Sequence, residues 1–237
     1  MNKIAVFTDI HGNLQALQAI LEDIKKEKID DVICLGDVIG IGPNSKETLQ
    51  LIKENNIELI LGNHEIYFLN QFRENEILEA GSRHTEHHKW ISSLLDDDDR
   101  DFLSKCKLYK KIENKDMVLS HFFFKENFKE GEYPFLEIDI RKKENREDGR
   151  ISNTNKYNLF GHIHQKSYFE KGKNKYYCLG SSGCTQDNYT FYNIVTLENE
   201  NVVIREKRIK FDRVKFDKTM QEIEYPEKLE IYERFFL

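Results

Sequence analysis

Two histidines, His162 and His164, are separated by one residue in the stretch "NLFGHIHQKS", directly after an apolar run. Residues two apart in a strand point to the same side, so the two imidazoles could reach one metal ion. An isolated pair of this kind is more often a pair of surface or core-edge histidines. The metal interpretation therefore depends on whether other parts of the chain supply further ligands.

Other predicted strands also end in side chains that bind metals or protons. The first is followed by Asp9 and His11, the second by Asp37, the third by Asn63 and His64, and a later one by His121. Functional groups collect at the carboxyl ends of strands in α/β sheets. We therefore expect these groups and the two paired histidines to form one site assembled from the whole sheet.

The number of candidate ligands points to two metal ions. One tetrahedral ion needs about four ligands. The chain offers Asp9, His11, Asp37, Asn63, His121, His162 and His164. Two ions about 3.5–4 Å apart need a bridging group, for which an Asp carboxylate is suited. No Cys is placed at these positions, and mixed nitrogen and oxygen ligands suit divalent Mn, which we expect first, or Fe, Zn or Ni.

The elements that must position these residues alternate between strand and helix in the first part of the chain. Strand-like runs at 3–9, 31–37 and 57–65 are separated by helical patterns at 13–29 and 45–56. This alternation is typical of a parallel sheet with crossover helices.

After residue 107 the pattern changes. Residues 64–105 are predicted to be helical, with a break at the aspartate run 96–99. The later predicted strands are 107–113, 116–124, 156–162, 166–171, 175–181, 188–198 and 201–209. Residues 125–155 show no clear pattern, and the tail from about 216 is predicted to be helical. We expect an α/β sandwich, parallel in one half and antiparallel in the other, and one domain over 1–237 because no linker separates the halves.

Composition restricts the partners and the compartment. With a formal net charge of −6 and no basic stripe, the chain is not patterned to follow a long nucleic acid, so a small substrate is expected. No apolar run reaches about 18 residues, so no membrane span is expected. Neither a signal peptide nor a CxxC pair is visible, and the four cysteines are scattered. A cytoplasmic protein with reduced thiols is the simplest interpretation.

Five motifs follow one another along the chain. They are "TDIHGN" (8–13), "LGDVIGIGPN" (35–44), "LGNHE" (61–65), "LSH" (119–121) and "FGHIH" (160–164). In this order they resemble the motifs of the calcineurin-like metallophosphoesterase superfamily. The glycine-serine loop "LGSSGCTQD" (179–187) and the "GDVxGxGP" form resemble its bacterial and archaeal branch of predicted phosphodiesterases, the YfcE-like type. The resemblance implies a four-layer α/β/β/α sandwich of two mixed sheets flanked by helices.

The resemblance also implies a role for each matching residue. Asp9, His11 and His164 would bind a first ion, Asn63, His121 and His162 a second, and Asp37 would bridge them. His64 would not bind metal, but would stabilise developing charge or protonate the leaving oxygen. The implied reaction is hydrolysis of a phosphodiester by a hydroxide that bridges the ions. A phosphomonoesterase or phosphoprotein phosphatase is the alternative, and a non-catalytic binding module is a remote one.

The chain departs from the pattern at three places. "HFFF" (121–124) is bulky where the branch has small residues, and the glycine-serine loop lacks its usual preceding proline. The Asp that orients the catalytic histidine in protein phosphatases is missing after the "GD" motif, which leaves open what orients His64.

Several residues have two interpretations. Asn13 is expected to be a helix N-cap, with a phosphate contact as the alternative. Phe122 could form a wall against a flat leaving group or belong to the core. His84, His87 and His88 share one helix face, for which a solvated surface is expected rather than a metal site. Trp90 beside them is expected to anchor that helix to the core.

Overall fold

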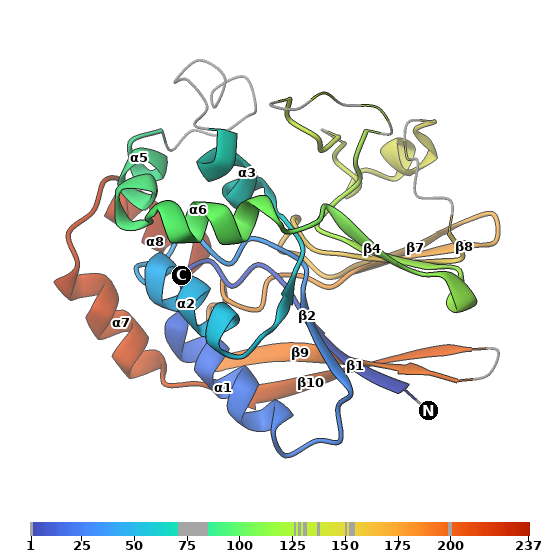
Figure 1. Ribbon diagram of the computed structural model, residues 1–237, viewed down its shortest axis with the longest axis horizontal. Helices are drawn as coiled ribbons and strands as arrows, with labels where there is room; N and C mark the ends of the chain where they lie inside the picture. The colour runs from blue at the N-terminus through green and yellow to red at the C-terminus, as the bar shows by residue number, and fades with distance from the viewer. Residues whose placement is uncertain are drawn as a thin grey trace.

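Two five-stranded sheets face each other in the computed structural model of the protein (Figure 1). The structure describes residues 2–70, 85–125, 127, 129, 132–136, 138–149, 151, 155–198 and 201–237. The first sheet contains, in order, β10 (Val202–Lys210), β9 (Tyr189–Leu197), β1 (Asn2–Phe7), β2 (Asp31–Cys34) and β3 (Glu58–Leu59). The second contains β4 (Tyr109–Ile112), β5 (Met117–Ser120), β6 (Tyr157–Phe160), β8 (Asn174–Cys178) and β7 (Ser167–Lys171).

Both sheets are mixed, as the resemblance implied. In the first, β1, β2 and β3 are parallel, and β9 and β10 continue the sheet in antiparallel pairs. In the second, β5, β6 and β8 are parallel between the antiparallel edge strands β4 and β7. The predicted parallel pairing of the first three strands is therefore confirmed, whereas the prediction of an antiparallel second half is wrong for β5, β6 and β8. The link from β5 to β6 lacks the helical periodicity that would have signalled a crossover.

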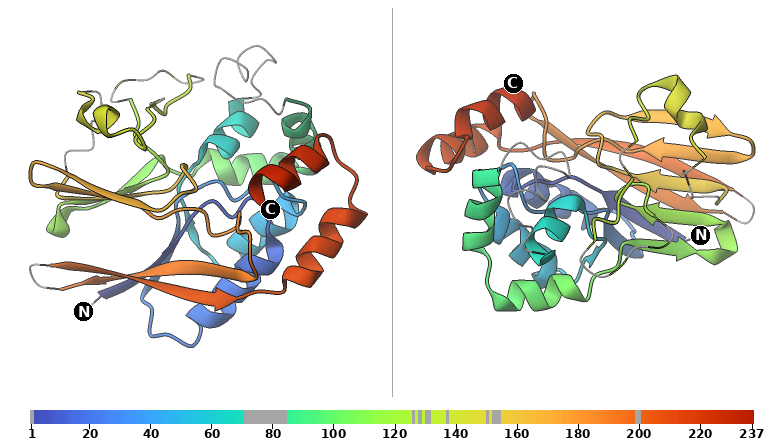
Figure 2. Two further views of the ribbon diagram at one scale, coloured as in Figure 1. Left: turned by 180° about the vertical axis from the view of Figure 1, so that it is seen from behind. Right: turned by 90° about the horizontal axis from the view of Figure 1, so that it is seen from above.

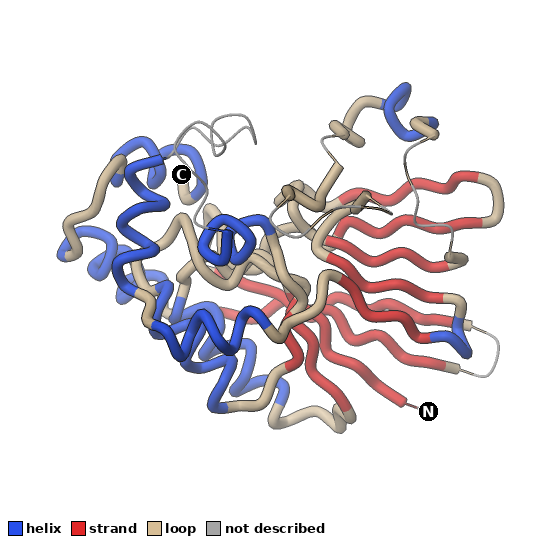
Figure 3. The backbone as a smooth tube through the Cα atoms, turned by 45° about the horizontal axis from the view of Figure 1, so that its top comes forward, coloured by secondary structure: helices blue, strands red, loops and turns tan. Residues whose placement is uncertain are grey.

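The α-helices gather at one end of the molecule and the strands at the other, with loops between them (Figure 3). The α-helices are α1 (Leu14–Ile24), α2 (Ser45–Glu54), α3 (Asn63–Asn70), α5 (Thr85–Leu94), α6 (Asp97–Ser104), α7 (Arg213–Glu222) and α8 (Lys228–Phe235). The predicted third strand is shorter than expected, because Asn63 already begins α3. The helical tail is confirmed by α7 and α8.

Strand periodicity divides the core. Ile4 and Val6 of β1 lie between the sheets, whereas Ala5 and Phe7 on the opposite face pack in the cluster that contains Leu17 of α1. The outer face of the second sheet is covered by the described parts of the segment after β5, which include the 3₁₀ helix η2 (Lys143–Glu147) (Figures 1 and 2). The expected α/β sandwich of two mixed sheets flanked by helices is confirmed.

Local signals set the helix starts. Asn13 caps α1 by accepting from the backbone N–H of Ala16 at 3.0 Å, as expected. Asp96 and Asp99 form a capping box at the start of α6, so the aspartate run begins a helix. Trp90 stacks on Tyr225 with ring centroids 4.8 Å apart, and so anchors α5 as predicted. No helix in the described ranges is long and apolar enough to cross a membrane.

Candidate metal centre

The first group of candidate ligands surrounds the imidazole of His11. Its Nε2 lies 2.9 Å from Nε2 of His164, 3.6 Å from Oδ2 of Asp37 and 3.7 Å from Oδ1 of Asp9. Nε2 of His164 is also 3.4 Å from Oδ1 of Asp9. The structure thus brings together the three residues expected around the first ion and the expected bridge.

A second group surrounds His121. Its Nε2 lies 3.0 Å from Oδ1 of Asn63, 3.2 Å from Nδ1 of His162 and 3.3 Å from Oδ2 of Asp37. Nδ1 of His162 and Oδ1 of Asn63 are 2.9 Å apart. The same oxygen of Asp37 therefore faces both groups, and all seven predicted ligands converge on two adjacent points.

The hydrogen-bond partners of two histidines fit a role of these groups as metal ligands. Nδ1 of His121 lies 2.9 Å from the carbonyl oxygen of Leu35, and Nδ1 of His11 lies 3.3 Å from that of Ile39. Because a carbonyl only accepts, both Nδ1 atoms donate, so each ring presents its Nε2 lone pair to the site once it is neutral. A cation between them satisfies such an arrangement, and a histidine held through its second nitrogen is typical of metal sites.

Electrostatics also favour negative carboxylates here. Burial by itself raises the pKa of Asp9, but hydrogen bonds with His11 and His164 hold it well below its usual value. Burial by itself also raises the pKa of Asp37. The charge of His121 outweighs this effect, so the pKa of Asp37 is lowered. Burial lowers the pKa of His162 to about 4, so this imidazole is neutral at pH 7 and can act as a ligand.

The backbone is strained where it presents the ligands. Asp9, His11, Asp37, His162 and His164 have φ angles of 54°, 49°, 52°, 66° and 59°. The left-handed region costs a non-glycine residue about 1–2 kcal/mol. Its concentration at five candidate ligands is characteristic of a functional site, where the surrounding structure maintains strain.

Glu65 supports the loop that carries Asp37. Its carboxylate accepts from the backbone N–H groups of Asp37 at 2.8 Å, Val38 at 2.9 Å, Ile39 at 3.2 Å and Gly62 at 2.8 Å. The residue is fully buried, and burial together with the charge of Asp37 raises its pKa to about 7. The sequence analysis gave Glu65 no role, although an acid directly after two site residues was a usable signal.

His64 lies beside the ligand groups but is held by packing. Its ring is 5.0 Å from that of His11 and 5.1 Å from that of His88, between centroids. Gly40 has a φ of +90°, and a Cβ there would lie 2.1 Å from Nδ1 of His64, so only glycine leaves room for the ring. Nδ1 is buried and has no hydrogen-bond partner in the described part of the chain. Burial keeps the pKa of His64 well below its usual value, so the imidazole is neutral.

A cleft of about 1490 Å³ opens over both groups. Asp37, Asn63, His64, His162 and His164 lie in its lining. The wall also contains Tyr67 of α3, Tyr133, and Ile231, Arg234 and Phe235 of α8. The sequence analysis missed these wall residues because they lie outside the motifs.

His87 and His88 correct a prediction. Their exposed fractions are 1% and 7%, so the solvated helix face expected for them is wrong. Both line the cleft, because α5 turns this face toward α3 and the site. The third histidine of that pattern, His84, lies outside the described residues.

The structure also bears on the two possible substrate contacts. Asn13 is fully buried; its Oδ1 caps α1 and its Nδ2 donates to the carbonyl of Gly183 at 2.8 Å. Both polar atoms are thus engaged within the protein. Phe122 lines the cleft although it is almost fully buried, with its ring centroid 4.6 Å from that of His162. Phe123 is a core residue.

Cys184 lies closer to the site than expected. Its Sγ and imidazole nitrogens of His11 and His164 all lie within 4.8 Å of one another. Burial lowers the pKa of His164, but Cys184 and Asp9 together raise it well above its usual value. The seven predicted ligand positions include no cysteine, so the sequence analysis missed the proximity of Cys184. The glycine-serine loop carried the residue, but its spacing did not match a known ligand motif.

Known proteins with similar sequences carry information on the family of this chain. A family model described as calcineurin-like phosphoesterase matches residues 2–222. An uncharacterised protein of Methanocaldococcus jannaschii is 33% identical over 120 residues, which are 50% of this chain and 48% of that protein. A symmetrical bis(5′-nucleosyl)-tetraphosphatase of Pseudomonas syringae is 31% identical over 111 residues, 46% of this chain and 35% of the relative. The chain thus spans less than half the length of these curated relatives.

A solved structure shares the fold over nearly the whole chain. A metallophosphoesterase from Sphaerobacter thermophilus superposes with a TM-score of 0.70 at 19% identity, and the match covers 96% of both chains. The family match over most of the chain, the five motifs and the convergence of their residues agree. The chain therefore belongs to the calcineurin-like phosphoesterase family, whose members are metal-dependent hydrolases of phosphoric esters.

Proposed function

We propose that the chain is a dinuclear metal-dependent phosphoesterase that hydrolyses a phosphodiester bond in a small substrate. One observation carries this proposal: two groups of ligand atoms share Oδ2 of Asp37, which lies 3.6 Å from Nε2 of His11 and 3.3 Å from that of His121. A carboxylate between two sets of convergent lone pairs is the arrangement that a bridged pair of ions requires.

The residues divide between two ions. Asp9, His11 and His164 would hold the first ion, Asn63, His121 and His162 the second, and Asp37 both. Divalent ions, once bound, neutralise the phosphate oxygens and lower the pKa of water so that a nucleophile exists near neutral pH. Manganese is the first candidate, with iron, zinc or nickel as alternatives, because most ligand atoms are nitrogen and oxygen.

His64 would act on the substrate. A half-buried, neutral imidazole can donate a hydrogen bond to the oxygen on which charge develops, without bringing an additional positive charge. Packing against Gly40 and His88 would hold the ring without the carboxylate that is missing from this chain. We therefore propose that packing, and not a carboxylate, orients the ring of His64.

The size of the cleft favours a substrate larger than a simple phosphate ester. Its volume of about 1490 Å³ exceeds the roughly 300–1,000 Å³ that is usual for small-molecule sites. The preference for a diester comes from the motif resemblance, and a monoesterase on the same site is the alternative. A nucleoside polyphosphate is a second candidate substrate, supported by the relatives named bis(5′-nucleosyl)-tetraphosphatase.

A metal-reconstituted screen tests the proposal. The metal-free chain is loaded with Mn²⁺, Ni²⁺, Zn²⁺ or Fe²⁺ and assayed on bis-p-nitrophenyl phosphate, p-nitrophenyl phosphate, cyclic nucleotides and diadenosine tetraphosphate. We expect two ions per chain by elemental analysis and the highest kcat/KM on a diester. One ion or none, or no hydrolysis with any metal, would contradict the proposal.

Substitution of Asp37, the proposed bridging ligand, tests how the ligands divide between the two ions. Asp37→Ala should lose both ions and nearly all activity, because Asp37 faces both ligand groups. His121→Ala should weaken mainly the second ion. Equal metal loss in the two variants would show that the division of ligands between the ions is wrong.

A further inference from the structure

Cys184 is held on the backbone of a candidate ligand of the first ion. The hydroxyl of Ser181 donates to the carbonyl oxygen of Asp9 at 2.7 Å and accepts from the backbone N–H of Cys184 at 2.8 Å. The backbone N–H of Gly183 donates to the same carbonyl at 3.0 Å. Three hydrogen bonds thus place the backbone of Cys184 relative to that of Asp9.

The loop cannot shift away without breaking other contacts. A Cβ at Gly183 would lie 1.9 Å from the carbonyl oxygen of Ile10, so the two backbones are in direct contact there. The carbonyl of Gly183 also accepts from Nδ2 of Asn13 at 2.8 Å. The buried Asn13 therefore ties this loop to the "TDIHGN" segment that carries two of the candidate ligands.

The surroundings of Cys184 differ from those of the other cysteines. The thiols of Cys34, Cys106 and Cys178 each contact a backbone carbonyl oxygen, at 3.8, 3.5 and 3.3 Å. Cys184 instead lies with His11 and His164, with ligand atoms as closely grouped as those of Asp37, His121 and His162. Cys184 also lines the cleft and is partly exposed, so the residue lies at the edge of the first ligand group.

We propose that Cys184 is a fifth side-chain ligand of the first ion, in addition to Asp9, His11, His164 and Asp37. This inference rests on the proposed dinuclear site. On binding, the thiol would release its proton to solvent and its sulfur would donate an electron pair to the ion, so no oxidant is needed. Because thiolate is a soft ligand, the first position would prefer Zn²⁺ or Fe²⁺ over Mn²⁺, whereas the second, with nitrogen and oxygen ligands only, would not.

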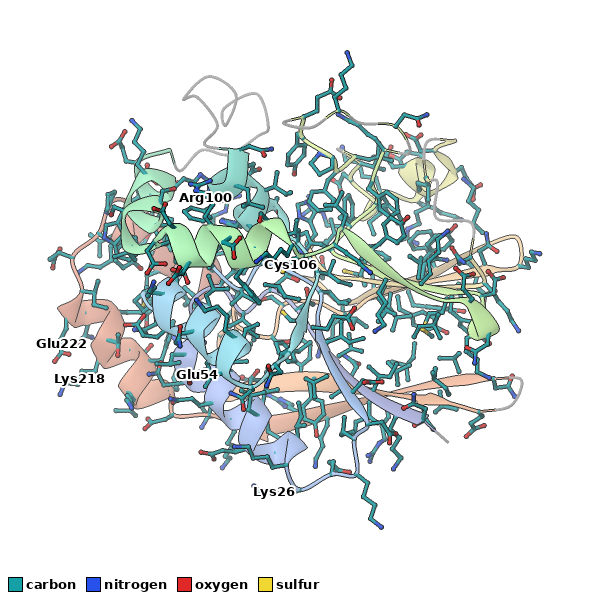
Figure 4. All side chains as sticks on the ribbon, viewed as in Figure 1. Lys26, Glu54, Arg100, Cys106, Lys218 and Glu222 are labelled. Atoms are coloured by element: carbon teal, nitrogen blue, oxygen red, sulfur yellow. The ribbon has the colours of Figure 1, made fainter. Side chains whose placement is uncertain are left out.

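Cobalt spectroscopy tests this inference independently of activity. The metal-free chain is loaded with two equivalents of Co²⁺, and we expect a near-ultraviolet charge-transfer band from thiolate to cobalt. Cys184→Ser should abolish the band and keep the visible bands of cobalt bound by histidine. Cys106→Ser is the matched control, because Cys106 is also partly exposed but lies at the end of α6 (Figure 4), and this variant should keep the band.

Metal competition gives a second measurement. With equimolar Zn²⁺ and Mn²⁺, the preference of the first position for zinc should fall by at least about tenfold in Cys184→Ser. Even the loss of a residue that only hydrogen-bonds a metal ligand lowers metal affinity by about 10–100-fold. Cys184→Ala should behave alike, and an unchanged thermal midpoint shows that both variants fold. A wild-type chain that binds two cobalt ions and hydrolyses ester without the band would overturn this inference alone. A chain that binds no metal would overturn the proposed function too.

Discussion

At the scale of single residues, His64 differs from the seven candidate ligands in how it is held. The ligands contact one another through nitrogen and oxygen atoms, whereas the ring of His64 is fixed by Gly40 and neighbouring rings. Its backbone N–H donates to Oδ1 of Asp37 at 3.0 Å, which ties its position to the proposed bridge. Its proposed role in turnover can therefore be tested separately from metal binding.

Substitution of His64 should affect turnover and not metal content. His64→Asn should keep two ions and lower kcat by roughly 10²–10⁴-fold, the range expected when a proton or hydrogen-bond donor is removed. The loss should be smaller with p-nitrophenolate, which leaves readily without a proton, than with an alkyl leaving group. Steady-state kinetics and elemental analysis measure both effects. Metal loss in this variant would make His64 a ligand, and full activity on the alkyl ester would remove its role in the reaction.

Metal binding should depend on pH through His121. Burial by itself lowers the pKa of this imidazole, but the Asp37 carboxylate overcomes it and raises the pKa to about 9 in the metal-free protein. At pH 7 His121 is therefore protonated and must release a proton before it binds an ion. The affinity for the second ion should rise by about tenfold per pH unit between pH 7 and 9 and level off above. Chelator competition at several pH values measures this slope, and a flat profile would contradict it.

At the scale of elements, the start of α3 connects the site to the loop after β2. Glu65 in the first turn of α3 accepts from four backbone N–H groups, three of which belong to the consecutive residues Asp37, Val38 and Ile39. Since Asp37 has a left-handed backbone, this carboxylate stabilises a conformation that the chain would not adopt alone.

Replacement of Glu65 tests this support. In Glu65→Gln an amide NH₂ replaces one carboxylate oxygen, so two buried N–H groups lose their acceptor. The free energy of unfolding should fall by roughly 2–4 kcal/mol, and binding of both ions should weaken. Denaturant unfolding and metal titration measure these changes. Glu54→Gln, on the exposed side of α2 (Figure 4), is the control and should change neither; an unaltered Glu65→Gln variant would remove the supporting role.

At the scale of the whole molecule, the C-terminal helix returns to the site. The family match ends at residue 222, yet α8 beyond it contributes Ile231, Arg234 and Phe235 to the cleft. The ring centroid of Phe235 lies 5.6 Å from that of His164. Arg213 holds α8 in place by donating to the carbonyl of Phe236 at 3.0 Å. This helix is therefore placed to distinguish substrates without taking part in metal binding.

Arg234 should contribute to the binding of anionic substrates. Arg141, Lys166 and Arg208, which also line the cleft, each pair with an acidic side chain, whereas the structure gives Arg234 no acidic partner among the described residues. Arg234→Ala should raise KM for a substrate with a second phosphate by about 3–10-fold and leave kcat nearly unchanged. Lys218→Ala, on the outer side of α7 (Figure 4), should leave both constants unchanged. An unchanged KM in Arg234→Ala would exclude this contact.

The periodicity of the chain was sufficient to predict most elements, and it failed where local pattern was ambiguous. The β5–β6 connection has no helical repeat, so the parallel pairing of these strands was missed. The face of His87 and His88 was interpreted as solvated because polar residues on a helix usually face water. Packing of α5 against α3 buries both residues, a contact that no spacing within α5 can indicate.

The sequence by itself determined which residues make up the candidate metal centre. Each predicted ligand follows a strand, and within one sheet the ends of neighbouring parallel strands meet. The strands nevertheless belong to two sheets, so it is the packing of the sheets that brings the ligands after β1, β2 and β3 together with those after β5 and β6. Only the tertiary structure decided that Cys184, His88 and Arg234 line the cleft over this centre, because their positions depend on how loops and helices from distant parts of the chain pack over the sheets. It also decided that His64 is neutral and held by packing, because burial and neighbouring charges arise only when the layers come together.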